Sequence, residues 1–106
     1  FPVFFGIFKD NKLVSVNSCF MSNDWQDSVY FRSRGLWTDP EYRKQGFASL
    51  ILLETIKYAK DNHGTWIWSV PRETSLVAYE SVGFKRWSGW KEELEFGPNC
   101  IAIKYL

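Results

Sequence analysis

The sequence has 106 residues, 45% of them hydrophobic, and a formal net charge of +1. This length suits one globular domain with one modest core, which we expect to span residues 1–106. The near-neutral charge and the lack of a basic stripe argue against binding to nucleic acid. No apolar run reaches the ~18 residues that a membrane span needs, so no membrane partner is expected.

Cysteine and aromatic content narrows the class further. Cys19 and Cys100 lie in apolar or alternating runs, which favours buried free thiols over a disulfide framework. The cysteines and the single histidine, His63, show no metal-ligand spacing, so no metal is expected. Without a signal-peptide pattern we expect a cytoplasmic protein, although the chain opens on Phe1 rather than Met and residues upstream could be missing. The 19% aromatic content suits a core filled with large rings, or a few rings around a substrate pocket.

The first predicted elements form a hairpin. Residues 3–8 are apolar and aromatic, as expected of a strand. Asp10 and Asn11 tolerate left-handed geometry and predict the turn. Residues 13–20 form the return strand, in which apolar and polar side chains alternate. The polar residues 22–27 predict a loop.

Residues 29–37 predict a third strand. Arg32 and Arg34 share one face of it. Gly35 indicates either a bulge or the close approach of another backbone. Pro40 ends the strand, since the residue before a proline prefers extended geometry. Residues 47–60 then predict a largely apolar helix, with Gly64 as its C-cap.

The second half continues with shorter elements. Residues 65–70 predict a strand that is parallel to the third, because a helix connects the two. A second helix over residues 75–82 follows, with Glu73 or Thr74 as its cap. Strands at 84–87, 92–96 and 100–105 complete the chain, the last two as a hairpin. The sum is an α+β fold with two helices and one central mixed, mostly antiparallel sheet.

The start of the first helix suggests an anion site. The first N–H groups of a helix have no acceptor within it and therefore favour an anion. Arg43 and Lys44 stand where the helix dipole disfavours positive charge, and a bound polyphosphate would resolve that conflict.

These residues resemble a known family. Arg43-x-x-Gly46-x-Ala48, after Asp39-Pro40-Glu41, looks like the acetyl-CoA pyrophosphate loop of the GNAT superfamily of N-acetyltransferases. A second motif of that family follows at the expected distance, in residues 76–84. The resemblance implies a GNAT-like (acyl-CoA N-acyltransferase) fold that lacks the family's first strand and first two helices.

The resemblance also implies a binding site for acetyl-CoA as the donor. The N–H groups of residues 45–48 would face the pyrophosphate, and the end of the third strand would hydrogen-bond the pantetheine arm and polarise the thioester. Trp37 is expected to be core or pocket wall. Arg72 replaces an Asn that is common in the family and could contact the phosphates. The implied cofactor-binding residues are Leu36, Trp37, Thr38, Arg43, Lys44, Gln45, Gly46, Phe47, Ala48 and Arg72.

The family's general acid corresponds to Tyr79, which would protonate the thiolate; the alternative is a tyrosine that anchors the core. Many relatives carry a glutamate base on the third strand, but residues 32–34 contain no acid here. Glu73 and Ser69 are the nearest substitutes, although Glu73 also suits a cap or a surface charge. The acidic cluster Glu92, Glu93 and Glu95 suits a solvated face, or recognition of a basic acceptor.

We therefore expect an acetyltransferase in which an amine acceptor attacks the thioester of acetyl-CoA directly. The alternative is a catalytically weak or inactive acyl-CoA-binding or protein-interaction module of the same fold. The sequence does not indicate which amine is accepted. In the family, the first strand and first two helices that this chain lacks help to form the acceptor site. A homodimer would be one way to complete that site.

Overall fold

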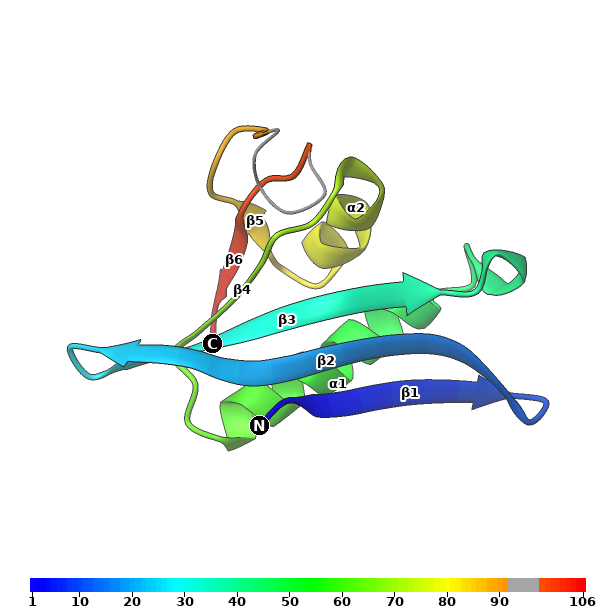
Figure 1. Ribbon diagram of the computed structural model, residues 1–106, viewed down its shortest axis with the longest axis horizontal. Helices are drawn as coiled ribbons and strands as arrows, with labels where there is room; N and C mark the ends of the chain where they lie inside the picture. Colours follow the sequence, from blue (N-terminus) through cyan, green and yellow to red (C-terminus); the bar gives the residue numbers. More distant parts are fainter. Residues whose placement is uncertain (92–97) are drawn as a thin grey trace.

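The computed structural model describes residues 1–91 and 98–106, and the predicted strand at 92–96 and the acidic cluster on it lie outside these ranges. The elements along the chain are β1 (Val3–Lys9), β2 (Lys12–Trp25), β3 (Ser28–Thr38), η1 (Pro40–Tyr42), α1 (Phe47–Asp61), β4 (Trp66–Ser69), α2 (Glu73–Ser81), β5 (Lys85–Arg86) and β6 (Ala102–Tyr105). They form a six-stranded sheet in the order β1-β2-β3-β4-β6-β5 (Figure 1). β3 and β4 run parallel and the other pairs antiparallel, which confirms the predicted mixed α+β sheet.

Two tight hairpins join β1, β2 and β3. Asp10 and Asn11 form the first turn with φ values of 52° and 62°, as their tolerance of left-handed geometry predicts. Gln26 and Asp27 form the second turn in the same way, with φ values of 47° and 65°. The loop predicted at residues 22–27 is therefore wrong for all but this turn, since β2 continues to Trp25 and its residues 23–25 pair with residues 28–30 of β3. Cross-strand pairing overrides the polar composition there.

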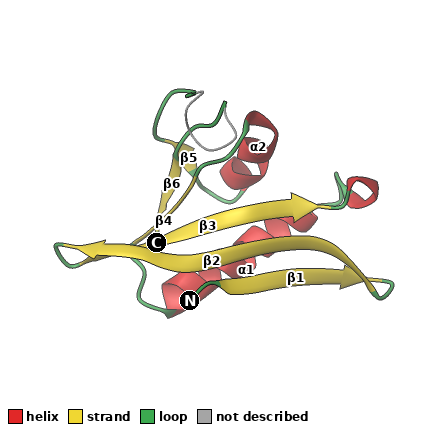
Figure 2. Cartoon of the chain, viewed as in Figure 1, coloured by secondary structure: helices red, strands yellow, loops and turns green. Residues whose placement is uncertain are grey.

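The core lies between the sheet and α1, which covers one face of β1, β2 and β3 (Figures 1 and 2). Val14 is buried on β2, and so are three alternating residues with short side chains, Ser15, Asn17 and Cys19. They leave room for the apolar face of α1. The buried hydrophobic cluster consists of Cys19, Phe31, Leu52, Ile56, Ala59, Ile67, Leu76, Tyr79, Phe84, Cys100 and Ala102.

The core holds fewer aromatic rings than the composition suggests. Phe31, Tyr79 and Phe84 are the aromatic residues of the buried cluster. Phe4 and Trp87 are 77% and 70% exposed, and other rings also lie at the surface. The prediction of a core filled mostly with large rings is therefore wrong for the described residues.

Gly35 forms a bulge in β3. Ser18 pairs with Arg34 and Val16 with Trp37, so that one residue of β2 faces two residues of β3. Gly35 has φ +83°, and a Cβ atom added to it would meet no other atom within 4 Å, which confirms the bulge and excludes the close approach. The extra residue shifts the alternation, so Trp37 points away from the core and is 43% exposed; of the two expected positions, core or pocket wall, the core is therefore wrong.

Both helices differ from the prediction at their ends. α1 begins at Phe47 as predicted, but its C-cap is Asn62, and His63 takes the left-handed conformation at φ +64°. Gly64 is needed for another reason: a Cβ there would lie 2.8 Å from the carbonyl oxygen of Ala59. α2 begins at Glu73 with Arg72 as N-cap, so neither Glu73 nor Thr74 is the cap.

The parallel contact between β3 and β4 is short. It comprises the pairs Tyr30–Trp66, Phe31–Ile67 and Arg32–Trp68. β3 continues to Thr38, whereas β4 ends at Ser69 and turns toward α2. The two strands therefore diverge after Arg32 (Figure 1).

Candidate acyl-CoA site

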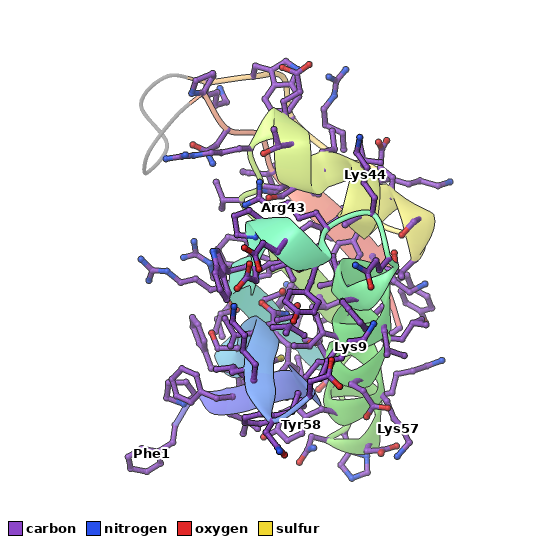
Figure 3. The ribbon with its side chains drawn as sticks, turned by 90° about the vertical axis from the view of Figure 1, so that its right-hand side faces the viewer. Phe1, Lys9, Arg43, Lys44, Lys57 and Tyr58 are labelled. Atoms are coloured by element: carbon purple, nitrogen blue, oxygen red, sulfur yellow. The ribbon has the colours of Figure 1, made fainter. Side chains whose placement is uncertain are left out.

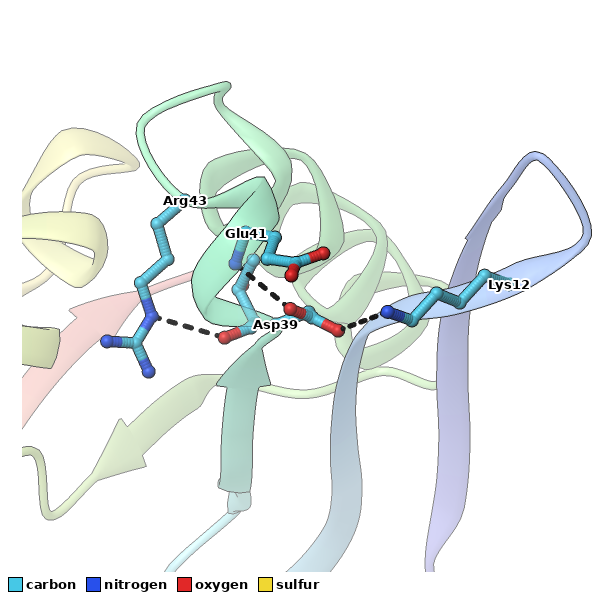
Figure 4. A network of polar contacts seen from close by, with 5 residues as sticks. Lys12, Asp39, Glu41 and Arg43 are labelled. Atoms are coloured by element: carbon cyan, nitrogen blue, oxygen red, sulfur yellow. Dashed lines mark hydrogen bonds and ion pairs between the residues drawn. The ribbon is translucent and has the colours of Figure 1, made fainter.

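The turn between β3 and α1 is held from several sides (Figure 4). Asp39 accepts a hydrogen bond from the N–H of Glu41 at 3.0 Å and forms an ion pair with Lys12 at 3.0 Å. The hydrogen bond from Glu41 and the contact with Lys12 lower the pKa of Asp39, and Asp39 in turn raises the pKa of Lys12. Arg43 donates from Nε to the carbonyl oxygen of Thr38 at 3.2 Å. The loop that precedes α1 therefore starts from a fixed turn.

The loop itself has an anion-binding geometry. Lys44 and Gly46 adopt φ values of +62° and +82°, and left-handed residues of this kind turn successive N–H groups toward one point. The helical bond from Leu50 N to Gly46 O measures 3.0 Å, so the N–H groups just before Leu50 have no helical acceptor. Arg43 and Lys44 extend from this loop as exposed side chains (Figure 3). A lysine in the left-handed region carries backbone strain of the kind found at binding sites.

Lys9 is a further residue of this loop site, and its place in the sequence did not mark it as one. Its Nζ donates to Oε1 of Gln45 at 3.3 Å and lies 5.7 Å from the centre of the Phe47 ring, which adds a third cation to the loop. The signal was present in the topology. Because β1, β2 and β3 are consecutive antiparallel strands, the end of β1 and the end of β3 lie at the same edge of the sheet. The turn after β1 therefore lies beside the loop that follows β3.

The end of β3 presents polar groups on its open side. Toward β2, the carbonyl oxygen of Trp37 accepts a hydrogen bond from Ser15 Oγ at 3.0 Å, and the N–H of Asp39 donates to the carbonyl oxygen of Val14. Peptide groups alternate along a strand, so those of Leu36 and Thr38 point away from β2. Of the three residues expected at the pantetheine arm, Leu36 and Thr38 have this orientation and Trp37 does not.

Tyr79 is 2% exposed and connects three elements. Its phenol oxygen lies 2.8 Å from Ser33 Oγ on β3 and 2.9 Å from Ser69 Oγ, which donates to it from β4. Burial raises the pKa of Tyr79, and the hydrogen bonds with Ser33 and Ser69 oppose that rise. The ring packs edge-on against Phe84 at 4.9 Å. Tyr79 is thus a core residue whose hydroxyl lies where β3 and β4 begin to diverge.

A buried polar network continues from Tyr79 to α1. Asn17 Nδ2 donates to Ser33 Oγ at 2.9 Å and to Thr55 Oγ1 at 3.0 Å. Thr55 in turn donates to the carbonyl oxygen of Ile51 at 2.8 Å. Small polar residues in strands look like solvent-facing positions, so the sequence pattern carries no signal for this network.

The candidate bases occupy different environments. Ser69 is buried, and its single hydroxyl hydrogen can reach Tyr79 or the carbonyl oxygen of Ser33, which lies at 2.8 Å. Glu73 and Arg72 are exposed at the start of α2, and the backbone of Arg72 bridges to Asn99. Ser69 therefore contacts the candidate acid Tyr79, whereas Glu73 lies at the surface.

The two cysteines and the histidine lie away from the loop that precedes α1 in sequence. Cys19 and Cys100 are buried free thiols, and burial raises the pKa of Cys19 to about 12. His63 is exposed at the end of α1. Within residues 1–91 and 98–106, no group of three or more His, Cys, Asp or Glu side chains is arranged to hold a metal ion. No helix among the described residues is long and apolar enough to cross a membrane.

Comparison with known proteins defines the class. Residues 2–86 match the family model of the acetyltransferase (GNAT) domain. The chain therefore belongs to the GNAT acyltransferase family, and its mixed six-stranded sheet with two helices is a GNAT fold. No curated protein sequence matches the chain.

Solved structures share the fold at low sequence identity. The PaiA N-acetyltransferase from Thermoplasma acidophilum, in complex with coenzyme A, has 20% identity and a TM-score of 0.72, with 99% of this chain and 61% of that chain covered. The NatC complex bound to Gag peptide and CoA has 20% identity and a TM-score of 0.79, with 92% of this chain and 64% of that chain covered. The ribosomal-protein-alanine N-acetyltransferase from Brucella melitensis has 14% identity and a TM-score of 0.76, with 97% of this chain and 68% of that chain covered. The chain thus spans about three fifths of the length of the first two, and the likeness shows the fold alone.

Proposed function

We propose that this chain is an N-acetyltransferase that moves an acetyl group from acetyl-CoA to an amine. One observation carries the proposal: the anion-receptive start of α1 lies directly after the part of β3 that has left β4. The pyrophosphate would bind the N–H groups of residues 45–48, with Lys9, Arg43 and Lys44 contributing positive charge. The acetyl-pantetheine arm would follow β3 toward Ser33.

The chemistry would proceed by direct attack. The neutral amine nitrogen adds to the thioester carbonyl carbon, the oxyanion accepts a hydrogen bond from a β3 N–H group, and the C–S bond then breaks. The peptide groups of Leu36 and Thr38 have the orientation for this role. The product amide loses one proton, and the CoA thiolate gains one.

Tyr79 is the proposed source of the thiolate's proton. Its raised pKa keeps the phenol protonated at neutral pH, and its hydroxyl lies at the divergence of β3 and β4. Glu73 and Ser69 remain the candidate bases. Glu73 is exposed and can exchange a proton with solvent, whereas Ser69 lies against Tyr79.

Calorimetry with acetyl-CoA tests the donor half of this proposal. We expect binding that weakens with salt, as phosphate contacts require, and that weakens further in Gly46→Ala, since alanine is strained at φ +82°. Gly83→Ala is the matched control, at φ +101° near the end of α2. Absence of binding at millimolar acetyl-CoA contradicts the proposal.

A second candidate function is an acyl-CoA-binding module without turnover. The enclosure of the Tyr79 hydroxyl by Ser33 and Ser69 favours it, because both neighbours of the proposed acid are already protein groups. Thiol release from acetyl-CoA in the presence of a panel of amines separates the two. Tight binding without release supports the module, and amine-dependent release supports the enzyme.

A further inference from the structure

A cavity of about 540 Å³ lies on the face of the sheet opposite α1. Phe31 and Ile67 point into the core beneath α1, so their neighbours on β3 and β4 point to this other face. The residues that line the cavity are Asn23, Tyr30, Trp66, Trp68, Trp87, Ile101 and Ile103. None of these described lining residues is charged.

Two of the rings that line the cavity, those of Trp66 and Trp68, are held in place. Trp68 donates from Nε1 to Ser22 Oγ at 3.0 Å, and the guanidinium of Arg32 stacks 4.8 Å from its ring centre. Trp66 packs edge-on against Tyr105 with ring centres 5.0 Å apart. A wall fixed in this way needs little reordering to receive a ligand, which favours affinity.

The cavity also has a defined place relative to the proposed acyl-CoA site. Tyr30 and Trp66 are the first parallel pair of β3 and β4, and Arg32 and Trp68 are the last. The next residues along these strands, Ser33 and Ser69, meet the hydroxyl of Tyr79. The near edge of the cavity, at Trp68, therefore lies one residue along β4 from Ser69, on the opposite face of the sheet from the point where the thioester would sit.

We infer that this cavity receives the apolar group of the amine acceptor. The acceptor class is a primary amine that carries an aryl or branched alkyl group, because indole, phenol and isoleucine side chains offer apolar contact and no counter-ion for a second charge. The inference rests on the proposed function, since it names the acceptor of the same reaction. A free aromatic amine and a peptide with an aromatic N-terminal residue share this chemistry.

Calorimetry in the presence of saturating CoA tests this inference without turnover. We expect 2-phenylethylamine to bind about tenfold or more tightly than ethanolamine, a primary amine in which a hydroxyl group replaces the ring. In Trp87→Ala the affinity for 2-phenylethylamine should fall at least threefold while CoA affinity stays unchanged, and Trp87 is 70% exposed, so the variant should fold. Trp90→Ala, an exposed tryptophan outside the lining, should bind as the wild type does.

The outcomes separate this inference from the proposed function. Failure to bind acetyl-CoA overturns the proposed function, whereas 2-phenylethylamine and ethanolamine binding alike, or an unaffected Trp87→Ala variant, overturns the assignment of the cavity. Peptides that begin with Phe and with Gly distinguish the two sources. A preference for the Phe peptide over free 2-phenylethylamine supports a peptide acceptor, and the reverse supports a small amine.

Discussion

The hydroxyl oxygens of Ser69 and Tyr79 lie 2.9 Å apart, and this buried contact joins β4 to α2 just where β4 stops pairing with β3. Ser33 reaches the same phenol oxygen at 2.8 Å from the other strand. One hydroxyl group therefore bridges both sides of the divergence, so its removal affects the fold and the proposed chemistry in ways that can be measured apart.

Tyr79→Phe should lower the free energy of unfolding by about 1 kcal/mol, because Ser33 and Ser69 lose a buried partner. Urea unfolding measures this loss. If Tyr79 is the acid, thiol release should also show a lower kcat with an unchanged KM for acetyl-CoA. Tyr58→Phe is the matched control on α1. Loss of stability with full turnover would leave Tyr79 a structural role alone.

Lys44→Gly should raise stability and weaken acetyl-CoA binding together. Glycine removes the strain of φ +62°, worth up to about 1 kcal/mol. Loss of the charge at a helix start should weaken binding about two- to fivefold. His63→Gly, at φ +64°, should gain similar stability with unchanged affinity. Thermal unfolding and calorimetry of both variants check this. Equal affinities in the two variants would contradict a binding role for Lys44.

Cys19 should make the protein less stable in alkali. Its pKa is about 12 in the folded chain, whereas an unfolded thiol ionises near 9. Between these values the unfolded state binds fewer protons, so the free energy of unfolding falls as pH rises, by up to about 1.4 kcal/mol per unit. Urea unfolding at pH 8, 9 and 10 should show a shallower fall in Cys19→Ala. Parallel slopes for variant and wild type would count against this.

Asp39 should stabilise the turn before α1 in its ionised form. Its folded pKa lies below the usual 3.8, because the N–H of Glu41 and the ammonium of Lys12 favour the carboxylate. Its contribution is present above pH 4 and disappears as pH falls through the folded pKa. Asp39→Asn should therefore differ from the wild type at pH 7 and converge with it near pH 2. An NMR titration of the carboxyl group with an unshifted midpoint would contradict this.

Local chemistry predicted the elements that depend on neighbours in sequence. Asp10 and Asn11 predicted the first turn, and Gly46 marked the start of α1. The parallel β3–β4 pair also followed from the order of elements, since a helix between two strands reverses the chain. These inferences succeed because each one rests on backbone geometry.

The features that the sequence did not predict depend on distant partners. Trp37 points outward because one extra residue before it shifts the alternation of inward and outward side chains. Strict alternation along the sequence assigns these positions wrongly after a bulge. Asn17 joins Ser33 and Thr55 across three elements, and nothing in its own surroundings in sequence marks it as buried. Lys9 reaches Gln45 only because two hairpins fold back on each other.

The bulge at Gly35 has a consequence for how this site could vary. Ser33 pairs with Cys19 and Arg34 with Ser18, and after the bulge Trp37 pairs with Val16. A deletion of Gly35 would bring Leu36 opposite Asn17 and leave every one of these cross-strand pairs intact. Gly35 therefore affects the curvature of β3 but not its pairing with β2. Without this one residue the strand could become straighter toward the loop that precedes α1 and keep the same cross-strand neighbours.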